Sequence, residues 1–529
     1  MQRRDVLKIA SAGITAGLTQ PPALRAAISA PSGSFAGWIS VRDHGARGDG
    51  ATTDSPAINR AIESAAAGGG GTVFFPAGVY LSYSIRLKSN VALHFDQGAV
   101  LLAGPTPLNG AAGGGYDEAE PQGPWEPYQD YGHNHWHNSL LWGEELADIS
   151  ITGPGLIWGK GLSRGWDKET TRPDARKPGV GNKAIALKNC RNVLLRDFKI
   201  LEGGWFGILA TGIDNLTIDN LLIDTNRDGI DIDCCRNVRV SNCTVNSPWD
   251  DGICPKSSYA LGYARPTENL TIANCYVTGG YEVGSVLDGT WKPLADKRAW
   301  WTGRIKLGTE SNGGFRNIAV SNCIFESCKG LAIETVDGAL AEDIAVTNVT
   351  MRDLRSAPLF LRLGTRMRGP GDVKPGVLRR VLLSNITCTS ASPLPSILAG
   401  VPEHPLEDIK INGVTIEQVG GGDAAMAARI PEEKEAAYPD PEMFGALPAT
   451  GLFARHVRNL EVSNFEVAVR TADARPAFWL HDIDGADFFR VRTPAGAPAF
   501  DLRTCRRFRS FGSAQHDDMK FEEVADQKI

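Results

Sequence analysis

Apolar and polar residues alternate in short segments along most of the chain. In the segment CRNVRVSNCTV, which begins at Cys235, Val238 and Val240 stand two residues apart, and Val245 follows after a polar Asn-Cys corner. A period of two is typical of β-strands and differs from the 3.6-residue period of helices. Each such segment therefore predicts a short strand, a polar corner and a second short strand.

The same kind of segment recurs many times. Asn192, Asn215 and Asn237 occupy equivalent positions at intervals of 23 and 22 residues, and insertions lengthen the later steps to Asn269 and Asn317. A strand repeat in the low twenties is typical of one coil of a right-handed parallel β-helix. Because Asn tolerates unusual backbone dihedrals and bonds to neighbouring groups, the stacked corners predict an Asn ladder. We therefore expect an all-β, single-domain solenoid.

One stretch before the repeats has helical spacing instead. The segment SPAINRAIESAAA, from Ser55 to Ala67, begins with a candidate capping Ser and predicts a helix. Such a helix would cover the open end of the solenoid, where an exposed sheet edge would otherwise invite aggregation.

The remaining layout follows from changes in composition. We expect an export signal at 1–30, the β-helix domain at 31–510 and a polar, partly disordered tail at 511–529. An Ala-, Glu- and Pro-rich excursion at 420–447 interrupts the coils; we expect it to be helical around 432–437 and to pack near the cleft.

The first residues resemble a twin-arginine export signal. Arg3 and Arg4 precede a short apolar stretch, and small residues follow near Ala26 or Ala30. This predicts a periplasmic or secreted protein. No later stretch approaches the roughly 18 apolar residues of a membrane span, so none is expected.

Charge argues against nucleic acid as a partner. The formal net charge is −6, and the signal carries four basic residues against one acidic, so its removal leaves −9. A polyanion would then bind only at a local basic patch.

The ten cysteines follow the repeat rather than a disulfide pattern. Cys243, Cys275 and Cys323 each come directly after an Asn at the same point of the repeat, which predicts stacked, buried thiols. A disulfide stays open as an alternative, and Cys234, Cys235 and Cys328 are the places for it.

Three carboxylates are placed one repeat apart. Asp228 lies in NRDGIDI, and Asp250 and Asp251 lie in PWDDGI, 22 residues further on. Neighbouring strands are about 4.8 Å apart, so the three should cluster on one face. Clustering raises the pKa of at least one carboxyl, and glycoside hydrolysis needs one protonated acid beside an ionised base. Turn-capping Asp residues or a calcium site are the alternatives.

Several motifs together resemble the polygalacturonase family, glycoside hydrolase family 28, over roughly residues 40–469. They are GDGATTD with GGTVFFPAGVY, then SLLWGEELADISITGPGLIWGKG, NRDGIDI and DDGICPKSS. The resemblance implies a monomeric, inverting hydrolase of plant cell-wall polysaccharide or oligosaccharide that needs no metal or other cofactor. It implies that Asp250 is the general acid, that Asp228 and Asp251 hold and deprotonate the water, and that Asn226 contacts substrate.

The chain departs from the family where the family carries Gly-His-Gly and Arg-Ile-Lys. Arg304 and Lys306 flank an Ile, but the repeat register places them on the coil of the family's Ile-Gly-Ser segment, and Glu334 takes the position of the usual Lys. We expect Lys256, Arg304 and Lys306 to form a basic patch, and Glu310 and Glu334 to bond sugar hydroxyls.

An insertion between Val277 and Arg304 carries aromatic residues. Trp291, Trp300 and Trp301 could stack on sugars and close one end of the cleft, which favours exo action. Cover for the solenoid wall is the alternative.

The segment YGHNHWHNSLL places His133, His135 and His137 at alternate positions, on one face if the segment is extended. We expect substrate contacts, and assign one to His135. A zinc site is the alternative.

Two other functions stay open. A β-helix polysaccharide lyase of pectin would use a Lys or Arg base and often calcium. A non-catalytic glycan-binding β-helix protein would need no acid and base, which the paired carboxylates disfavour.

Overall fold

The structure is a computed structural model that describes residues 37–108, 111–165, 173–295 and 301–529. These belong to one structural unit, Ala36–Ile529. The expected export signal at 1–30 and Trp300 lie outside the described residues. Among the described residues, no helix has both the length and the apolar character that crossing a bilayer requires.

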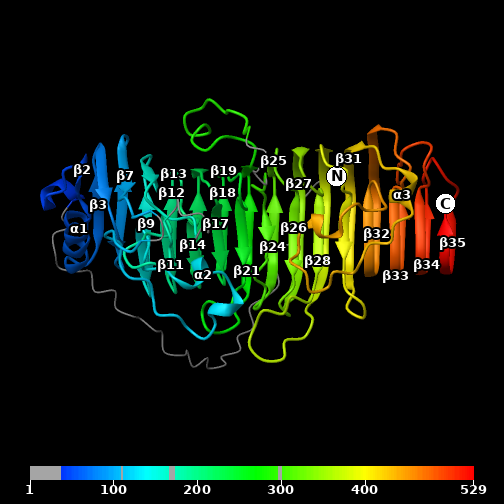
Figure 1. Ribbon diagram of the computed structural model, residues 1–529, viewed down its shortest axis with the longest axis horizontal. Helices are drawn as coiled ribbons and strands as arrows, with labels where there is room; N and C mark the ends of the chain where they lie inside the picture. The colour runs from blue at the N-terminus through cyan, green and yellow to red at the C-terminus, as the bar shows by residue number, and fades with distance from the viewer. Residues whose placement is uncertain (1–36, 109–110, 166–172, 296–300) are drawn as a thin grey trace, which may run out of the picture. The chain divides into compact units, whose positions relative to one another are not determined.

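Strands of successive coils pair in parallel and build three walls of a β-helix (Figure 1). The first wall contains β1 (Ile39–Ser40), β3 (Gly71–Phe75), β6 (Val91–Phe95), β9 (Ala147–Thr152), β12 (Arg191–Arg196), β15 (Asp214–Asp219), β18 (Arg236–Ser241), β21 (Thr267–Ala273), β24 (Phe315–Ser321), and the long strands β27 (Leu340–Leu354), β29 (Val377–Ser390), β31 (Leu406–Gly420), β32 (Leu452–Thr471), β33 (Phe478–Phe489) and β34 (Phe500–Phe511).

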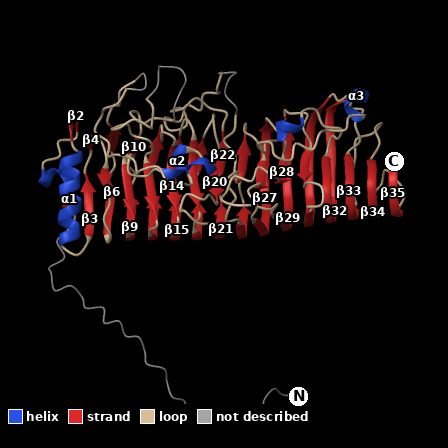
Figure 2. Ribbon diagram, turned by 60° about the horizontal axis from the view of Figure 1, so that its bottom comes forward, coloured by secondary structure: helices blue, strands red, loops and turns tan. Residues whose placement is uncertain are grey.

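The second wall contains β2 (Asp49–Thr53), β4 (Gly78–Ser82), β7 (Ala99–Ala103), β10 (Leu156–Trp158), β13 (Lys199–Leu201), β16 (Leu222–Asp224), β19 (Thr244–Asn246), β22 (Tyr276–Thr278) and β25 (Ile324–Glu326). The third wall, here called the site wall, contains β5 (Ile85–Arg86), β8 (Leu141–Glu144), β11 (Ile185–Lys188), β14 (Phe206–Thr211), β17 (Asp228–Asp233), β20 (Ile253–Lys256), β23 (Lys306–Leu307), β26 (Leu331–Thr335), β28 (Leu359–Leu363) and β30 (Ser396–Ala399). Most loops gather along one side of the solenoid (Figure 2).

The core consists of apolar residues stacked coil on coil. In the first wall the register joins buried residues of five successive coils, Val193, Leu216, Val238, Leu270 and Ile318. Burying each such side chain contributes on the order of 1.5–3 kcal/mol. The repeat therefore supplies one continuous core, as the alternating pattern predicts.

The predicted Asn ladder is confirmed. Side-chain amides join Asn215 to Asn192 at 2.9 Å, Asn237 to Asn215 at 3.3 Å, Asn269 to Asn237 at 3.0 Å and Asn317 to Asn269 at 2.8 Å. All five residues have a positive φ, between 54° and 62°. Asn is among the few residues that adopt this conformation readily, so the ladder fixes both the corner and the register.

Helix α1 (Ser55–Ala67) lies at the N-terminal end of the solenoid, as predicted (Figure 1). It buries Ile58, Ala61 and Ile62 against the first coils. The cap differs from the expectation, because Asp54 precedes the helix and makes no capping hydrogen bond with its side chain. Its carboxylate instead accepts the backbone N–H groups of Arg47 at 2.7 Å and Gly48 at 2.9 Å.

The C-terminal tail is ordered, contrary to the expectation of partial disorder. It forms β35 (Met519–Lys528), which pairs antiparallel with β34. Apolar Val524 is buried where the strands meet, so the alternation of the tail is that of a strand. The antiparallel strand covers the edge that the last coil would otherwise expose.

The other helices are short. They are α2 (Tyr131–Asn134), α3 (Ala424–Ala427) and the 3-10 helices Val41–His44, Glu126–Tyr128 and Pro441–Phe444. Residues 432–437 are not helical, contrary to the expectation for this stretch.

All ten cysteines are buried and unpaired, as the repeat predicts.

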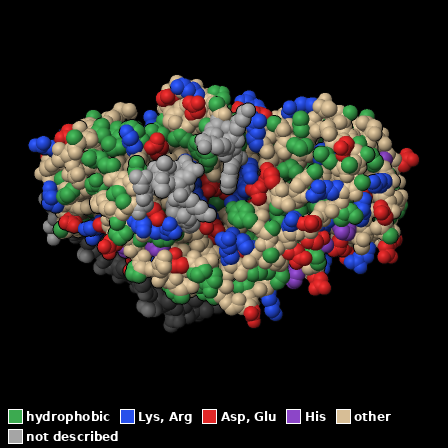
Figure 3. All heavy atoms as spheres, in the orientation of Figure 1, with side chains coloured by type: hydrophobic (Ala, Val, Ile, Leu, Met, Phe, Trp, Pro, Cys, Tyr) green, Lys and Arg blue, Asp and Glu red, His purple; other side chains and the backbone are tan. Residues whose placement is uncertain are grey.

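Acidic and basic side chains are interspersed over the face shown in Figure 3.

Candidate active site

The site wall positions the carboxylates. Ile230 and Ile232 of β17 point into the core. Asp231 and Asp233 alternate with them along the strand and therefore belong to the outer face. Asp228 begins β17, and Asp251 lies beside it on the next coil, where its carbonyl oxygen accepts the Gly229 N–H at 3.0 Å. The predicted proximity of the two motifs is therefore confirmed.

Glycine after each Asp motif lets the coils stack closely. A Cβ added to Gly229 would lie 2.5 Å from the carbonyl oxygen of Gly252, and one added to Gly207 would lie 2.6 Å from that of Gly229. No side chain fits at such distances, so Gly229 of NRDG and Gly207 on the coil before it allow the close stacking that brings the carboxylates together.

A pocket of about 130 Å³ opens over β17, β20 and β23. Of the three predicted catalytic residues, Asp228 and Asp250 line it and Asp251 does not. The lining residues are Asp130, His133, Phe206, Arg227, Asp228, Asp250, Lys256, Lys306, Thr309, Glu310, Arg366, Arg368 and Tyr438.

Two apolar clusters cover the outer face of the site wall on either side of this pocket. On the N-terminal side, loop residues including Trp136 and Trp205 pack on the outer face of β11 and β14. On the C-terminal side, Phe444 and Leu447 of the excursion pack on β28 and β30. The excursion therefore reaches the cleft, as expected, and the open part of the wall is short.

Asp228 is buried and poorly compensated. Its Oδ2 lies 3.6 Å from Lys256 Nζ, and its Oδ1 has no hydrogen-bond partner among the described residues. Burial first, and then the charges of Asp250 and Asp231, hold the pKa of Asp228 well above its usual range. One carboxyl of the cluster thus keeps its proton, as the clustering predicts.

Asp250 is the accessible carboxyl of the pair, with 31% of its side chain exposed. Its Oδ2 accepts a hydrogen bond from Arg227 Nε at 3.2 Å, and its Oδ1 accepts the Asp251 N–H at 3.1 Å. Arg227 lies over the Trp205 ring, which fixes the guanidinium beside the pocket.

Asp251 lies behind the pocket in two buried ion pairs. Its carboxylate accepts from Lys306 Nζ at 2.6 Å and from Arg304 Nε at 2.9 Å. Burial alone would raise the pKa of Asp251, but Lys306 and Arg304 hold it well below its usual range. The expected basic patch of Arg304 and Lys306 is therefore largely neutralised by a residue predicted to be catalytic.

Lys256 forms the centre of a buried network. Its Nζ lies 3.3 Å from His133 Nε2, 3.4 Å from Asp231 and 3.5 Å from Glu310. Burial raises the pKa of Asp231 to about 7, whereas Lys256 overcomes the effect of burial at Glu310 and holds its pKa well below normal. Burial followed by Lys256 lowers the pKa of His133, which is therefore a neutral imidazole.

Comparisons with known proteins agree with this geometry. Residues 183–355 match the family described as "Right handed beta helix region", and residues 38–99 match "Rhamnogalacturonase A/epimerase, pectate lyase-like". A probable polygalacturonase of Vitis vinifera is 25% identical over 422 residues, which are 74% of this chain and 76% of that protein. Over most of its length the chain is similar to members of the polygalacturonase-like family, glycoside hydrolase family 28.

Two further relatives are exo-acting by name. An exo-poly-α-D-galacturonosidase of Dickeya chrysanthemi is 23% identical over 384 residues, 61% of this chain and 57% of that protein. A family 28 exopolygalacturonase of Yersinia enterocolitica has a similar structure, with a TM-score of 0.61, 19% identity, and coverage of 85% of this chain and 78% of that one. The likeness between the structures shows the shared fold, a right-handed β-helix.

The register of this polygalacturonase-like chain follows the repeat. Ile305 bridges to Ile253, and Lys306 pairs with Ala332, so Glu334 lies on the coil after Lys306. Glu334 does not line the pocket. It is fully buried, neither of its oxygens has a hydrogen-bond partner among the described residues, and burial raises its pKa to about 7.

The other expected substrate contacts divide into two groups. Lys256, Lys306 and Glu310 line the pocket. Asn226 is half-buried outside it, and Arg304 is buried behind it against Asp251.

The expected aromatic contacts lie elsewhere. Trp291 packs edge-on against Tyr276 and Tyr281, outside the pocket, and the Arg355 guanidinium lies over the Trp301 ring. The insertion that carries Trp291 extends from β22, at the edge of the second wall (Figure 1). These aromatic residues thus cover the wall, which was the alternative.

The histidine segment turns instead of running straight. Because α2 includes His133 and ends at Asn134, the three histidines do not share a face. His135 is buried, stacks on Tyr131 and bonds its carbonyl oxygen, whereas His133 lines the pocket. The histidine of this segment that lines the pocket is therefore His133 and not His135.

His137 lies in the group that most resembles a metal site. It comes within 2.9 Å of Glu144 and 3.5 Å of Glu120, and their ligand atoms lie within 4.8 Å of one another. Lys188 already pairs with Glu144 at 2.8 Å, and the carboxylate of Glu120 accepts the Trp136 N–H. The two carboxylates therefore already have protein partners, Lys188 and the Trp136 N–H.

Loop residues of the pocket had no sequence signal. Arg366 and Arg368 follow β28, and Tyr438 comes from the excursion, where its hydroxyl accepts from Thr309 Oγ1 at 3.1 Å. Arg227 could have been found, because it lies inside the NRD motif.

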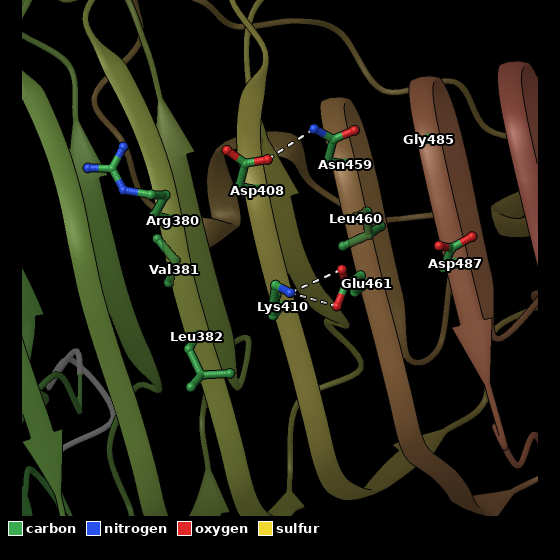
Figure 4. A pocket seen from close by; sticks show the side chains of 10 residues that line it. All are labelled: Arg380, Val381, Leu382, Asp408, Lys410, Asn459, Leu460, Glu461, Gly485 and Asp487. Carbon is green, nitrogen blue, oxygen red and sulfur yellow. Dashed lines mark hydrogen bonds and ion pairs between the residues drawn. The ribbon is translucent and has the colours of Figure 1, made fainter.

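A larger hollow of about 550 Å³ lies on the first wall (Figure 4). Its charged residues already have partners: Lys410 pairs with Glu461 at 3.0 Å, and Asp408 accepts from the Asn459 amide at 3.0 Å. It offers no cluster of buried carboxyls, so the smaller pocket is the candidate active site.

Proposed function

We propose that this chain is an exported, inverting glycoside hydrolase that cleaves pectin-type polysaccharide, namely galacturonan or rhamnogalacturonan-derived chains. The observation that carries the proposal is that Asp228 and Asp250, on adjacent coils, line one pocket. The names of the relatives and the resemblance to the polygalacturonase family support pectin as the substrate class.

Asp250 is the general acid in this mechanism. Its carboxyl is the accessible one, so it can reach the glycosidic oxygen and protonate the leaving group. Asp228 is the base that holds and deprotonates the water, using its free Oδ1. The proton that Asp228 holds in the free pocket passes to Asp250, which then acts as the acid and leaves Asp228 as the base.

Asp251 is a positioning residue in this account. Its ion pairs with Arg304 and Lys306 hold Lys306 at the pocket wall. Removing it would leave two buried cations without their partner, which is costly.

Exo action is supported by the short open stretch of the site wall. Apolar clusters cover the wall on both sides of the pocket, which suits a chain end better than the middle of a polymer. Two relatives carry exo activity in their names.

Lyase chemistry is the weaker candidate. A lyase base must lose its proton, but the acidic groups around Lys256, Asp231 first, outweigh its burial and hold its pKa well above the usual value. Lys256 is therefore a permanent cation, suited to binding rather than to proton abstraction.

Location outside the inner membrane rests on the twin arginines Arg3 and Arg4. Plant cell-wall polymers are met outside the cell, so export and the proposed substrate agree.

Digestion of polygalacturonate, rhamnogalacturonan fragments and neutral α-glycans tests the proposal. We expect reducing ends without ultraviolet absorbance, and small products from the first time point. Ultraviolet-absorbing products would indicate a lyase, and binding without any product would indicate a glycan-binding protein.

A further inference from the structure

Most cations of the pocket are already paired. Lys306 is held by Asp251 at 2.6 Å, and Arg227 lies between Asp250 at 3.2 Å and Asp130 at 3.6 Å. Lys256 has three acidic groups within 3.6 Å. These cations have little capacity left for an anionic substrate.

Arg366 is also paired, but one of its buried donors makes no hydrogen bond with the described residues. Asp337 accepts from its Nε at 3.0 Å and from its Nη2 at 2.5 Å, so a two-pronged ion pair fixes the guanidinium plane. Its Nη1 has no hydrogen-bond partner among the described residues, although only 6% of the side chain is exposed. The nearest acidic oxygen is that of Glu310, at 3.6 Å. A buried N–H donor without a partner costs free energy unless a ligand satisfies it.

Arg368 is held at the mouth of the same pocket. Its backbone N–H donates to Asp337 at 3.1 Å, so one carboxylate orients both arginines. Its side chain makes no ion pair with an acidic group in the described part of the chain, and the residue is exposed. The loop after β28 therefore presents two arginines with donors to spare.

Five Lys and Arg side chains line the pocket against four Asp and Glu, and Asp251 and Asp337 balance Lys306 and Arg366 from behind it. A neutral sugar would leave the Arg366 Nη1 donor unsatisfied, whereas a carboxylate can accept from it.

We infer that Arg366, assisted by Arg368, binds the carboxylate of a uronic acid residue and so selects an acidic sugar for the pocket. This inference rests on the proposed function and deepens it. The guanidinium offers a planar, always charged fork that matches a carboxylate, which a Lys does not.

A matched pair of substrates tests the inference. Oligogalacturonides and the same oligosaccharides after carboxyl reduction differ only in a carboxylate against a hydroxymethyl group. We expect Arg366→Gln to lower kcat/KM on the uronide about 10²-fold, mainly through KM, and to change the reduced substrate less than about 3-fold. Arg458→Gln, an exposed arginine on the first wall, is the control and should change neither.

Arg368→Gln is a second variant for the case that Arg366→Gln does not fold, because the Arg368 side chain is exposed and its loss should not disturb the fold. It should lower kcat/KM on the uronide about 5-fold with an unchanged melting temperature. Equal losses on both substrates, or no loss on the uronide with either variant, would overturn the inference.

Binding separates this inference from the proposed function. If the wild type hydrolyses neither substrate, the proposed function fails, and calorimetry with galacturonate and galactose still decides. Galacturonate binding that is lost in Arg366→Gln would support the uronate site. Equal binding of both sugars, binding unchanged in the variant, or no binding of galacturonate by the wild type would contradict it.

Discussion

Buried carboxyls around the pocket differ in how their charge is balanced. Asp251 has two cations within 2.9 Å and stays ionised, whereas Asp228 and Asp231 share the more distant Lys256. Glu334 has no hydrogen-bond partner among the described residues. Environment, rather than residue type, therefore decides which carboxyl keeps a proton.

Glu334→Gln should stabilise the protein in a pH-dependent way. Burial raises the pKa of Glu334 to about 7, with Lys306 opposing, so the folded state binds this proton more tightly than the unfolded chain. The wild type therefore loses stability as pH rises from the usual Glu value through 7. We expect the variant to gain on the order of 2 kcal/mol at about pH 8 relative to pH 4 by urea unfolding. The exposed Glu403→Gln is the control; a gain independent of pH would contradict the account.

At the element scale, the corners of the coils and the loops between strands have different roles. The Asn ladder fixes the coil register and hence the distance between the two Asp motifs. Loops that do not repeat, among them the excursion at 420–447, complete the pocket and cover the site wall.

The ladder can be tested at Asn237, whose φ is 58° and whose amide group bonds to Asn215 and Asn269. Asn237→Ala loses these bonds and strains the backbone, so we expect a loss of about 2 kcal/mol in the free energy of unfolding. Asn237→Gly loses the bonds without the strain and should be about 1 kcal/mol more stable than the Ala variant. A Gly variant no more stable than the Ala variant would show that the corner is not held in this conformation.

His456 connects the excursion at 420–447 to the solenoid. His456 Nδ1 lies 2.6 Å from Asp482 and its Nε2 lies 3.1 Å from Glu433, with Arg455 and His481 also close. Burial would lower the pKa of His456, but Glu433 and Asp482 raise it, so both contacts are charge-assisted while the imidazole is protonated. This fastening is complete below the usual His pKa and is lost as pH rises through the raised value.

Limited proteolysis measures the fastening. We expect cleavage within 420–447 to accelerate as the solution becomes alkaline, and His456→Gln to be cleaved quickly even at about pH 6. Cleavage rates that do not change with pH, in the wild type or the variant, would argue against this role for His456.

At the scale of the whole molecule, the repeat predicted most of the fold and part of the site. Periodicity gave the coils, the ladder and the adjacency of Asp228 to Asp250, because each depends on register alone. It could not give the ion pairs of Asp251 or the loop arginines Arg366 and Arg368, because side-chain direction and irregular loops leave no period in the sequence. The helical turn α2 was not predicted either, and because of it His133 lines the pocket in place of His135.

The solenoid thus supplies the floor of the pocket, and the loops complete its walls. Polysaccharide binding along a β-helix needs an open wall, but here apolar clusters leave only the stretch over β17, β20 and β23. The central claim is that Asp250 and Asp228 hydrolyse a glycoside in this pocket with inversion.

The most direct measurement is proton NMR of oligogalacturonide hydrolysis by the wild type and by Asp250→Asn, followed from the first minutes. The account predicts that the first anomer formed has inverted configuration, and that the variant keeps its melting temperature but loses about 10³-fold in turnover. Retained configuration, or undiminished hydrolysis by Asp250→Asn, would contradict it.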